Sequence, residues 1–187
     1  MTQNQWIGLF QMMFFFMPAL FFLRTFDIQN ACNKKSILKT AAVTVCVVLV
    51  VSIILNMLLG LWALVVAIPP ALKEALIKLL SIDKPYGLVI DLFTVSFIPA
   101  VCEEFFFRGV VQTGLSSFIK PRAAIITAAF FFAFYHLNPW FFPFFFVLGV
   151  LFGYVFLKTR NLGMAVLAHF VNNAFGVVVM HLYGPVF

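Results

Sequence analysis

The sequence predicts an all-α fold, a polytopic membrane helix bundle with six or seven transmembrane helices. Of its 187 residues, 64% are hydrophobic and only 10% are charged, whereas about a quarter of the residues of a soluble domain are charged. Apolar runs of about twenty residues, the length that a helix needs to cross a bilayer, recur along the chain. The whole chain, residues 1–187, is therefore expected to form one integral membrane domain.

Charged or Pro/Gly-rich breaks divide the chain into six expected spans. The first apolar run follows no basic segment and precedes no small-residue cleavage site, so it is interpreted as a retained span and not as a signal peptide. The expected spans are approximately 6–23, 37–60, 86–112, 122–137, 140–158 and 162–182.

Residues 61–81 fit two interpretations. The segment LWALVVAI extends the second span, but Pro69 and Pro70 interrupt it. The following ALKEALIKLL has apolar residues at helical spacing and charged residues on another face. This pattern favours an amphipathic helix on the membrane surface over a seventh span.

Basic residues in the short loops predict the orientation, because Lys and Arg accumulate on the cytoplasmic side. The expected inner loops hold Arg24, Lys34, Lys35, Lys39, Lys120, Arg122, Lys158 and Arg160, and the expected outer segments hold Lys73, Lys78 and Lys84. This distribution predicts that both termini face outward. It also explains the net charge of +6 without nucleic-acid binding. High Phe content and a short chain favour a bacterial cell membrane.

The stretch VCEEFFFRG places three charged residues inside an expected span. Each charge at mid-membrane costs about 2.5–3.5 kcal/mol on insertion scales. Glu104 and Arg108 are four residues apart and are expected to form an ion pair. Glu103 points about 100° away and is left for a different role. Asp91 and His181 lie near the expected outer ends of their spans and should face water or headgroups.

Two further polar clusters lie on later spans. In AAFFFAFYHLNP, Phe132 and His136 share one helix face, and in MAVLAHFVNNAFG, His169 and Asn173 do the same. Asn172 points about 100° away from its neighbour and is expected to make a polar contact between helices. Distances along the helices are compatible with one buried site that unites these clusters and the carboxylates.

The three motifs, E-E-x-x-x-R, F-x-x-x-H and H-x-x-x-N, resemble those of the CPBP family of intramembrane endopeptidases. This family includes CAAX proteases, Abi bacteriocin-processing enzymes and proteins linked to bacteriocin self-immunity. The resemblance covers about residues 86–182, the expected catalytic core. It implies an enzyme that hydrolyses a peptide bond in a membrane-associated protein or peptide.

The resemblance also implies a role for each motif residue. Glu103, assisted by His136, would activate water, and His169 and Asn173 would bind the oxyanion. A buried carboxylate suits the role of a general base. The motif residues expected to support the structure are Glu104, Arg108 and Phe132.

One other mechanism and two other functions remain open on the sequence. Glu103, His136 and His169 are residue types that also bind zinc, although the HExxH helix is absent and a metal-independent mechanism is favoured. No cofactor is firmly implied. A non-catalytic self-immunity protein that binds a peptide is the main alternative function. A proton-coupled transporter would also use buried Glu and His, but the internal repeats typical of transporters are not evident.

Overall fold

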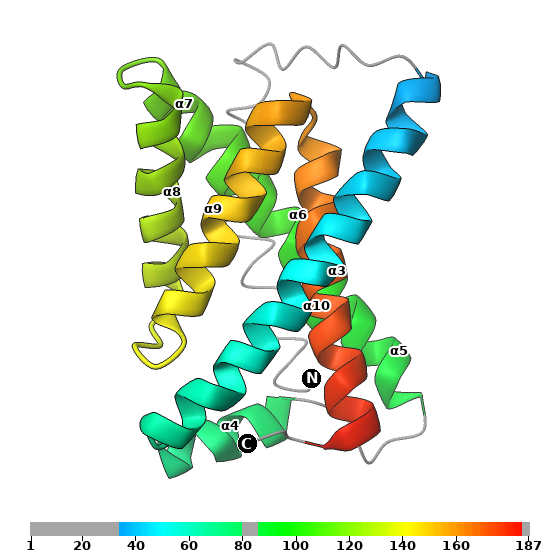
Figure 1. Cartoon of the computed structure of the whole chain (residues 1–187), viewed down its shortest axis with the longest axis vertical. Helices are drawn as coiled ribbons and strands as arrows, with labels where there is room; N and C mark the ends of the chain where they lie inside the picture. Colours follow the sequence, from blue (N-terminus) through cyan, green and yellow to red (C-terminus); the bar gives the residue numbers. More distant parts are fainter. Residues whose placement is uncertain (1–33, 80–85, 185–187) are drawn as a thin grey trace.

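The computed structural model describes residues 34–79 and 86–184, and every element within these ranges is helical (Figure 1). The predicted all-α fold is thereby confirmed, while the expected span 6–23 lies outside the described residues. The α-helices are α3 (Lys34–Val65), α4 (Pro70–Leu79), α5 (Gly87–Asp91), α6 (Ile98–Glu104), α7 (Thr113–Ser116), α8 (Pro121–Tyr135), α9 (Phe142–Thr159) and α10 (Leu162–Tyr183). Two π-helical segments are η2 (Leu92–Phe97) and η3 (Phe105–Gln112).

Three helices in the described part of the chain are long and apolar enough to cross a membrane. They are the Ile37–Val65 portion of α3, α9 and α10. The helix α8 is apolar but has 15 residues, and residues 86–112 are divided among shorter segments. The number of six or seven spans therefore stays a prediction.

The segment after the second span forms a separate short helix. The helix α3 continues to Val65, and α4 starts at Pro70. With 10 residues and a rise of about 1.5 Å per residue, α4 is too short to cross a bilayer. Figure 1 shows it lying across the end of the bundle where α3 ends. The interpretation of residues 70–79 as a separate helix is confirmed, and its position at the membrane surface stays a prediction.

The run from Gly87 to Ser116 changes helix type four times. It passes from α5 through η2 into α6, and then through η3 into α7. Pro99 has no N–H, so it cannot give the carbonyl of Val95, four residues earlier, its usual α-helical hydrogen bond. The π-helical segment η2 ends just before this proline. Such segments are frequent at functional sites, and here they flank the two glutamates of α6.

Close packing of α8 on α9 depends on small residues. A Cβ atom at Gly149 would lie 3.0 Å from the Cα and Cβ atoms of Ala129, and one at Gly153 would lie 3.1 Å from Cγ2 of Ile125. Small residues allow membrane helices to approach closely, because lipid supplies little hydrophobic force for their association. The helix α10 packs against α3, α6 and α9 and so brings its polar residues to the centre of the bundle.

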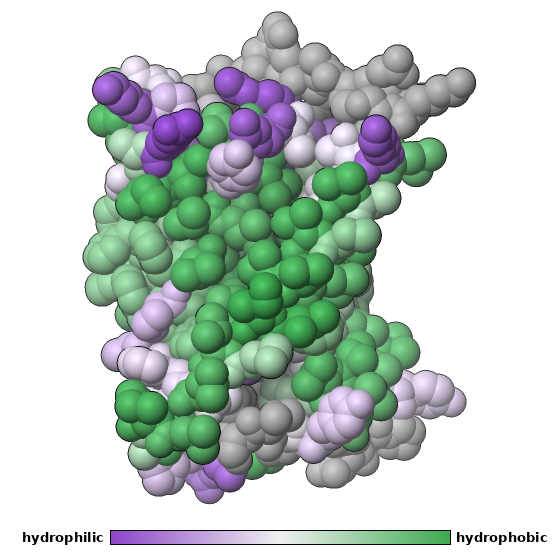
Figure 2. Space-filling model, viewed as in Figure 1, coloured by the Kyte–Doolittle hydropathy of each residue, from purple (hydrophilic) through white to green (hydrophobic). Residues whose placement is uncertain are grey.

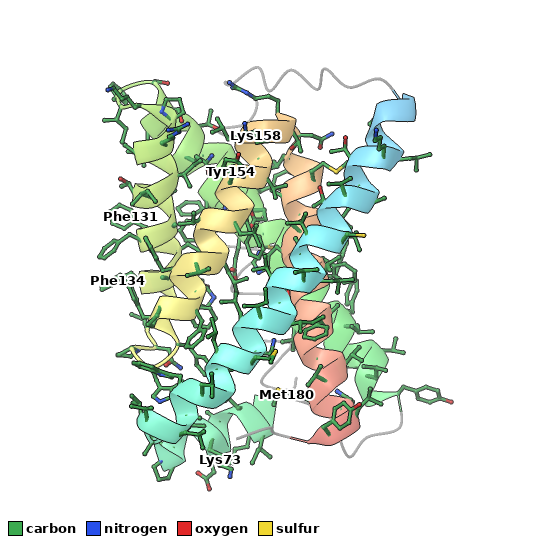
Figure 3. All side chains as sticks on the ribbon, in the orientation of Figure 1. Lys73, Phe131, Phe134, Tyr154, Lys158 and Met180 are labelled. Carbon is green, nitrogen blue, oxygen red and sulfur yellow. The ribbon has the colours of Figure 1, made fainter. Side chains whose placement is uncertain are left out.

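Hydrophilic residues gather at the end of the molecule where α3 begins (Figure 2). The α7–α8 loop and the α9–α10 turn lie at the same end (Figure 1). Figure 3 shows Lys158 at this end and Lys73 at the other. The separation of basic residues agrees with the sequence-based distribution, and the outward orientation of the termini stays a prediction.

Asp91 and His181 were expected to face water or headgroups, and for Asp91 this expectation is wrong. Asp91 is 0% exposed, and Nε2 of His181 lies 3.6 Å from its Oδ2 atom. The reason is tertiary, because α5 packs against α10 and each helix shields the polar side chain of the other.

Substitution of Gly149 by Ala tests the α8–α9 contact. The added Cβ atom would press on the backbone of Ala129, and overpacking of this kind costs about 1–3 kcal/mol. We expect Gly149→Ala to lower the melting temperature in detergent. Gly60→Ala is the matched control, since nothing lies within 4 Å of a Cβ atom there. Equal melting temperatures for the two variants would contradict the close contact.

Candidate active site

A buried ion pair joins Glu104 of α6 to Arg108 of η3. Oε1 of Glu104 lies 2.8 Å from Nη1 of Arg108, and the two side chains are 0% and 1% exposed. Nη2 of Arg108 donates a second hydrogen bond, of 2.7 Å, to the carbonyl of Gly149 on α9. The ion pair expected from the four-residue spacing is confirmed.

Two phenylalanine rings cover the guanidinium of Arg108. Its Cζ atom lies 4.9 Å from the ring centroid of Phe132 and 5.5 Å from that of Phe152. Cation–π contacts of this kind offset part of the cost of removing a cation from water. The motif residue Phe132 thus supports the ion pair, as well as packing in the core.

His169 of α10 lies between the two adjacent glutamates. Its Nδ1 atom is 2.8 Å from Oε1 of Glu104, and its Nε2 atom is 4.0 Å from Oε2 of Glu103. Because an ionised carboxylate can only accept hydrogen bonds, Nδ1–H of His169 donates to Glu104. The hydrogen bond therefore turns the other ring nitrogen of His169 toward Glu103. The sequence had assigned Glu104 only to Arg108, and its second bond is new.

The side chains of Glu103 and His169 are separated by about the space that one bridging polar atom needs. A distance of 4.0 Å is too long for a direct hydrogen bond. It is short enough for a single polar atom to contact both groups. Glu103 is 3% exposed and His169 is 3% exposed, so such an atom would sit in surroundings where electrostatic interactions are strong.

His136 lies beside this cluster, at the end of α8. Its Nδ1 atom is 2.8 Å from the carbonyl oxygen of Phe132, so Nδ1–H donates there and Nε2 is the remaining ring nitrogen. The ring stacks on Phe145, with centroids 3.9 Å apart. Phe132 contacts the rings of both His136 and His169, at 4.9 Å and 5.7 Å. One phenylalanine thus brings the two histidine motifs together.

Asn173 lies one helical turn after His169. Its Nδ2 atom is 3.5 Å from the carbonyl oxygen of Val95, and its Oδ1 atom accepts a 3.2 Å hydrogen bond from Asn172. Asn172 in turn accepts a 2.9 Å hydrogen bond from Ser52 of α3. The expected polar contact between helices at Asn172 is therefore confirmed.

The zinc set that the sequence left open as an alternative does not come together as a ligand cluster. Among the described residues, no group of three or more His, Cys, Asp and Glu side chains is placed to hold a metal ion. Nδ1 of His169 is bonded to Glu104, and His136 contacts aromatic rings and the carbonyl of Phe132 on its own helix. The grouping of Glu103, His136 and His169 that a zinc ion would need is therefore not present among the described residues.

Gln112 is a buried supporting residue that the motifs did not reveal. It is 3% exposed, and its Nε2 atom donates a 3.0 Å hydrogen bond to the carbonyl of Gly153. Gln112 follows Arg108 by four residues, just as Gly153 follows Gly149, so the two polar side chains bind successive turns of α9. The four-residue series from Glu104 through Arg108 was the available signal in the sequence.

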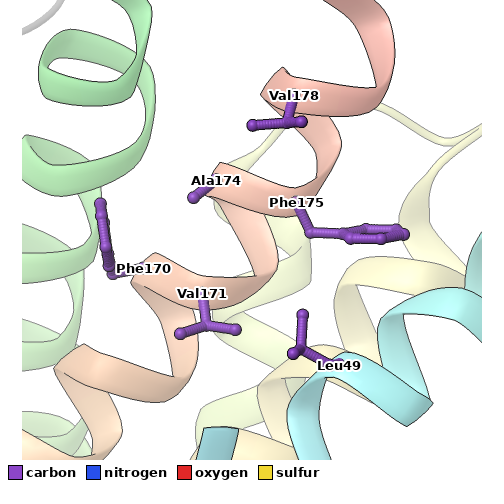
Figure 4. A pocket seen from close by; sticks show the side chains of 6 residues that line it. All are labelled: Leu49, Phe170, Val171, Ala174, Phe175 and Val178. Carbon is purple, nitrogen blue, oxygen red and sulfur yellow. The ribbon is translucent and has the colours of Figure 1, made fainter. Parts of the chain in front are cut away.

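An apolar groove between α3 and α10 is lined by none of these polar groups. Figure 4 shows its lining, which consists of Leu49, Phe170, Val171, Ala174, Phe175 and Val178. None of these side chains can donate, accept or transfer a proton. The candidate active site is therefore the buried polar cluster and not this groove.

Comparison with known proteins agrees with the motif-based resemblance. Residues 85–175 match the family model described as type II CAAX prenyl endopeptidase Rce1-like. The match includes every motif residue from Glu103 to Asn173, and Ser52 lies outside it. No curated protein and no solved structure matches the chain. The resemblance to the CPBP family is confirmed.

The two glutamates are expected to differ in their importance for stability. Glu104→Gln leaves Arg108 without its buried counter-charge, and loss of one partner of a buried pair costs about 3–5 kcal/mol. Glu103→Gln is the matched variant, one residue away and equally conservative in shape. We expect thermal unfolding in detergent to show a lower melting temperature for Glu104→Gln than for Glu103→Gln. The reverse order would contradict the structural role of Glu104.

Proposed function

Because residues 85–175 match the family model described as type II CAAX prenyl endopeptidase Rce1-like, we propose that this membrane protein is an intramembrane endopeptidase. It hydrolyses a peptide bond in a membrane-associated protein or peptide. The observation that carries the proposal is the 4.0 Å approach of His169 to Glu103. The ion pair of Glu104 with Arg108 holds His169 in place and compensates buried charge.

The proposed nucleophile is one water molecule held between Oε2 of Glu103 and Nε2 of His169. The separation of these atoms allows a water oxygen to lie at about 2.8 Å from each. When the water oxygen attacks the scissile carbonyl carbon, Glu103 takes the released proton. General-base catalysis of this type contributes typically about 10²–10⁴-fold to the rate.

Asn173 is the proposed donor to the oxyanion that forms on the carbonyl oxygen. Its Nδ2 contact with the carbonyl of Val95 is long, at 3.5 Å, so the substrate oxygen can replace it at little cost. An amide donates without adding a charge to the buried site. Fixed donors of this kind stabilise the charge that develops in the transition state. His169, which the resemblance names as a second oxyanion partner, donates Nδ1–H to Glu104, so in the proposed mechanism its Nε2 orients the attacking water instead.

His136 is proposed to assist proton transfer. Its Nδ1–H is held by the carbonyl of Phe132, which fixes the ring and leaves Nε2 to exchange a proton. Collapse of the tetrahedral intermediate breaks the C–N bond, and the proton taken by Glu103 passes to the leaving amine. The products are a carboxylic acid and an amine, and no other reactant is consumed.

The family description makes a prenylated CAAX peptide the first substrate to test. The proposed mechanism also applies to other membrane-bound peptides, because each reacting group acts on the peptide bond and not on the prenyl group. A pair of quenched fluorescent peptides with the same CAAX sequence, one farnesylated and one not, separates recognition of the lipid from recognition of the peptide.

The Glu103→Gln variant tests the proposal. Gln has nearly the shape of Glu but cannot accept the proton of the attacking water, so we expect cleavage by the purified chain in lipid nanodiscs to fall at least about 100-fold. Cleavage would be followed by fluorescence and by mass spectrometry of the products.

The matched control is Glu74→Gln, at an exposed glutamate on α4, and it should cleave at the wild-type rate. Thermal unfolding would establish that Glu103→Gln remains folded. Wild-type cleavage by folded Glu103→Gln would overturn the proposal.

A further inference from the structure

We propose that Ser52 of α3 is a positioning residue that fixes the orientation of the Asn173 side-chain amide. It acts through Asn172, and it lies outside the residues that match the family model. The inference rests on the proposed function, since it takes Asn173 as an oxyanion donor. It adds a helix before the matched region to the machinery of the site.

A chain of three hydrogen bonds connects α3 with η2 through α10. Oγ of Ser52 donates to Oδ1 of Asn172 at 2.9 Å. Nδ2 of Asn172 donates to Oδ1 of Asn173 at 3.2 Å. Nδ2 of Asn173 then faces the carbonyl oxygen of Val95 at 3.5 Å. Ser52 is 1% exposed, so its hydroxyl is anchored away from water.

The carbonyl of Val95, at one end of this series of hydrogen bonds, determines which side-chain atoms donate and which accept. The carbonyl of Val95 can only accept, so the amide group of Asn173 must turn its NH₂ toward it. Oδ1 of Asn173 then faces Asn172, which must present its own NH₂. Oδ1 of Asn172 consequently faces α3, where the residue must be a donor. A serine hydroxyl supplies that donor, whereas an alanine would not.

The sequence provides the acceptor at the other end. Pro99 lies four residues after Val95 and has no N–H to donate to its carbonyl. Because of this proline, a side chain from α10 can use the carbonyl of Val95. The same proline therefore accounts for the local change of helix type and for the contact of the Asn173 amide with the carbonyl of Val95.

Orientation matters because the two ends of an amide have opposite effects on an oxyanion. An NH₂ group donates to the developing charge, whereas a carbonyl oxygen repels it. Without Ser52, Oδ1 of Asn172 loses its hydrogen bond to α3, so the Asn172 amide is held less firmly and restrains the Asn173 amide less. The long contact to Val95 alone is a poor restraint, especially once a substrate oxygen replaces it.

The test compares Ser52→Ala, Asn173→Ala and the double variant of the full chain in nanodiscs. The probe is the farnesylated quenched CAAX peptide, and both kcat and KM are measured. Loss of one hydrogen bond predicts that Ser52→Ala lowers kcat about 3–10-fold, with KM unchanged because the amide acts in the transition state. In the Asn173→Ala background, Ser52→Ala should have no further effect on kcat.

Thr44→Val is the matched control, since it removes another buried hydroxyl from α3, two turns earlier, and should leave kcat unchanged. If Ser52→Ala fails to fold, Asn172→Leu breaks the same chain without adding charge and should lower kcat similarly.

The possible failures are distinguishable. No effect of Asn173→Ala on kcat would overturn the proposed oxyanion role, and the positioning role with it. A defective Asn173→Ala together with a fully active Ser52→Ala would overturn the positioning role alone. An equal fall of kcat on adding Ser52→Ala in both backgrounds would show a general structural effect and would also overturn it.

Discussion

The hydrogen-bonded carboxylate of Glu104 is the contact on which the rest of the site depends. It binds Arg108 and His169 at once, each at 2.8 Å, and Arg108 extends the connection to the backbone of Gly149. One oxygen thus ties α6, η3 and α10 together and, through the guanidinium, α9. Because His169 is held on this side, its free edge is turned to Glu103. The adjacent glutamates therefore differ: Glu104 maintains the geometry, and Glu103 is the base of the proposed mechanism.

Polar contacts can organise this bundle because lipid offers little hydrophobic force for bringing helices together. Side-chain donors reach backbone carbonyls of another helix at Arg108 and Gln112, and the glycines that present those carbonyls also allow α8 and α9 to approach. The same residues that stabilise the bundle consequently surround the candidate active site. A substitution at these positions is therefore expected to change stability and, in the proposed mechanism, the alignment of the reacting groups.

The sequence was sufficient for features that depend on local geometry. Hydrophobicity predicted the all-α membrane fold, and a four-residue spacing predicted the ion pair of Glu104 with Arg108. It was insufficient for contacts between distant segments, such as that of Glu104 with His169, 65 residues apart, or that of Ser52 with Asn172, 120 apart. Burial of Asp91 was also missed, because only the packing of α5 against α10 reveals it. Helical periodicity states which residues share a face but not which helix that face meets.

Solid-state NMR of the chain in lipid bilayers offers the most direct measurement of the central contact. A carbon-13 label on the side-chain carboxyl of glutamate and a nitrogen-15 label on histidine Nδ1 would report their dipolar coupling, with Glu104→Gln and Glu103→Gln identifying the residue responsible. The account predicts a strong coupling of His169 Nδ1 that persists in Glu103→Gln and disappears in Glu104→Gln. A coupling that is absent in the wild-type chain, or that survives loss of the Glu104 carboxylate, would contradict it.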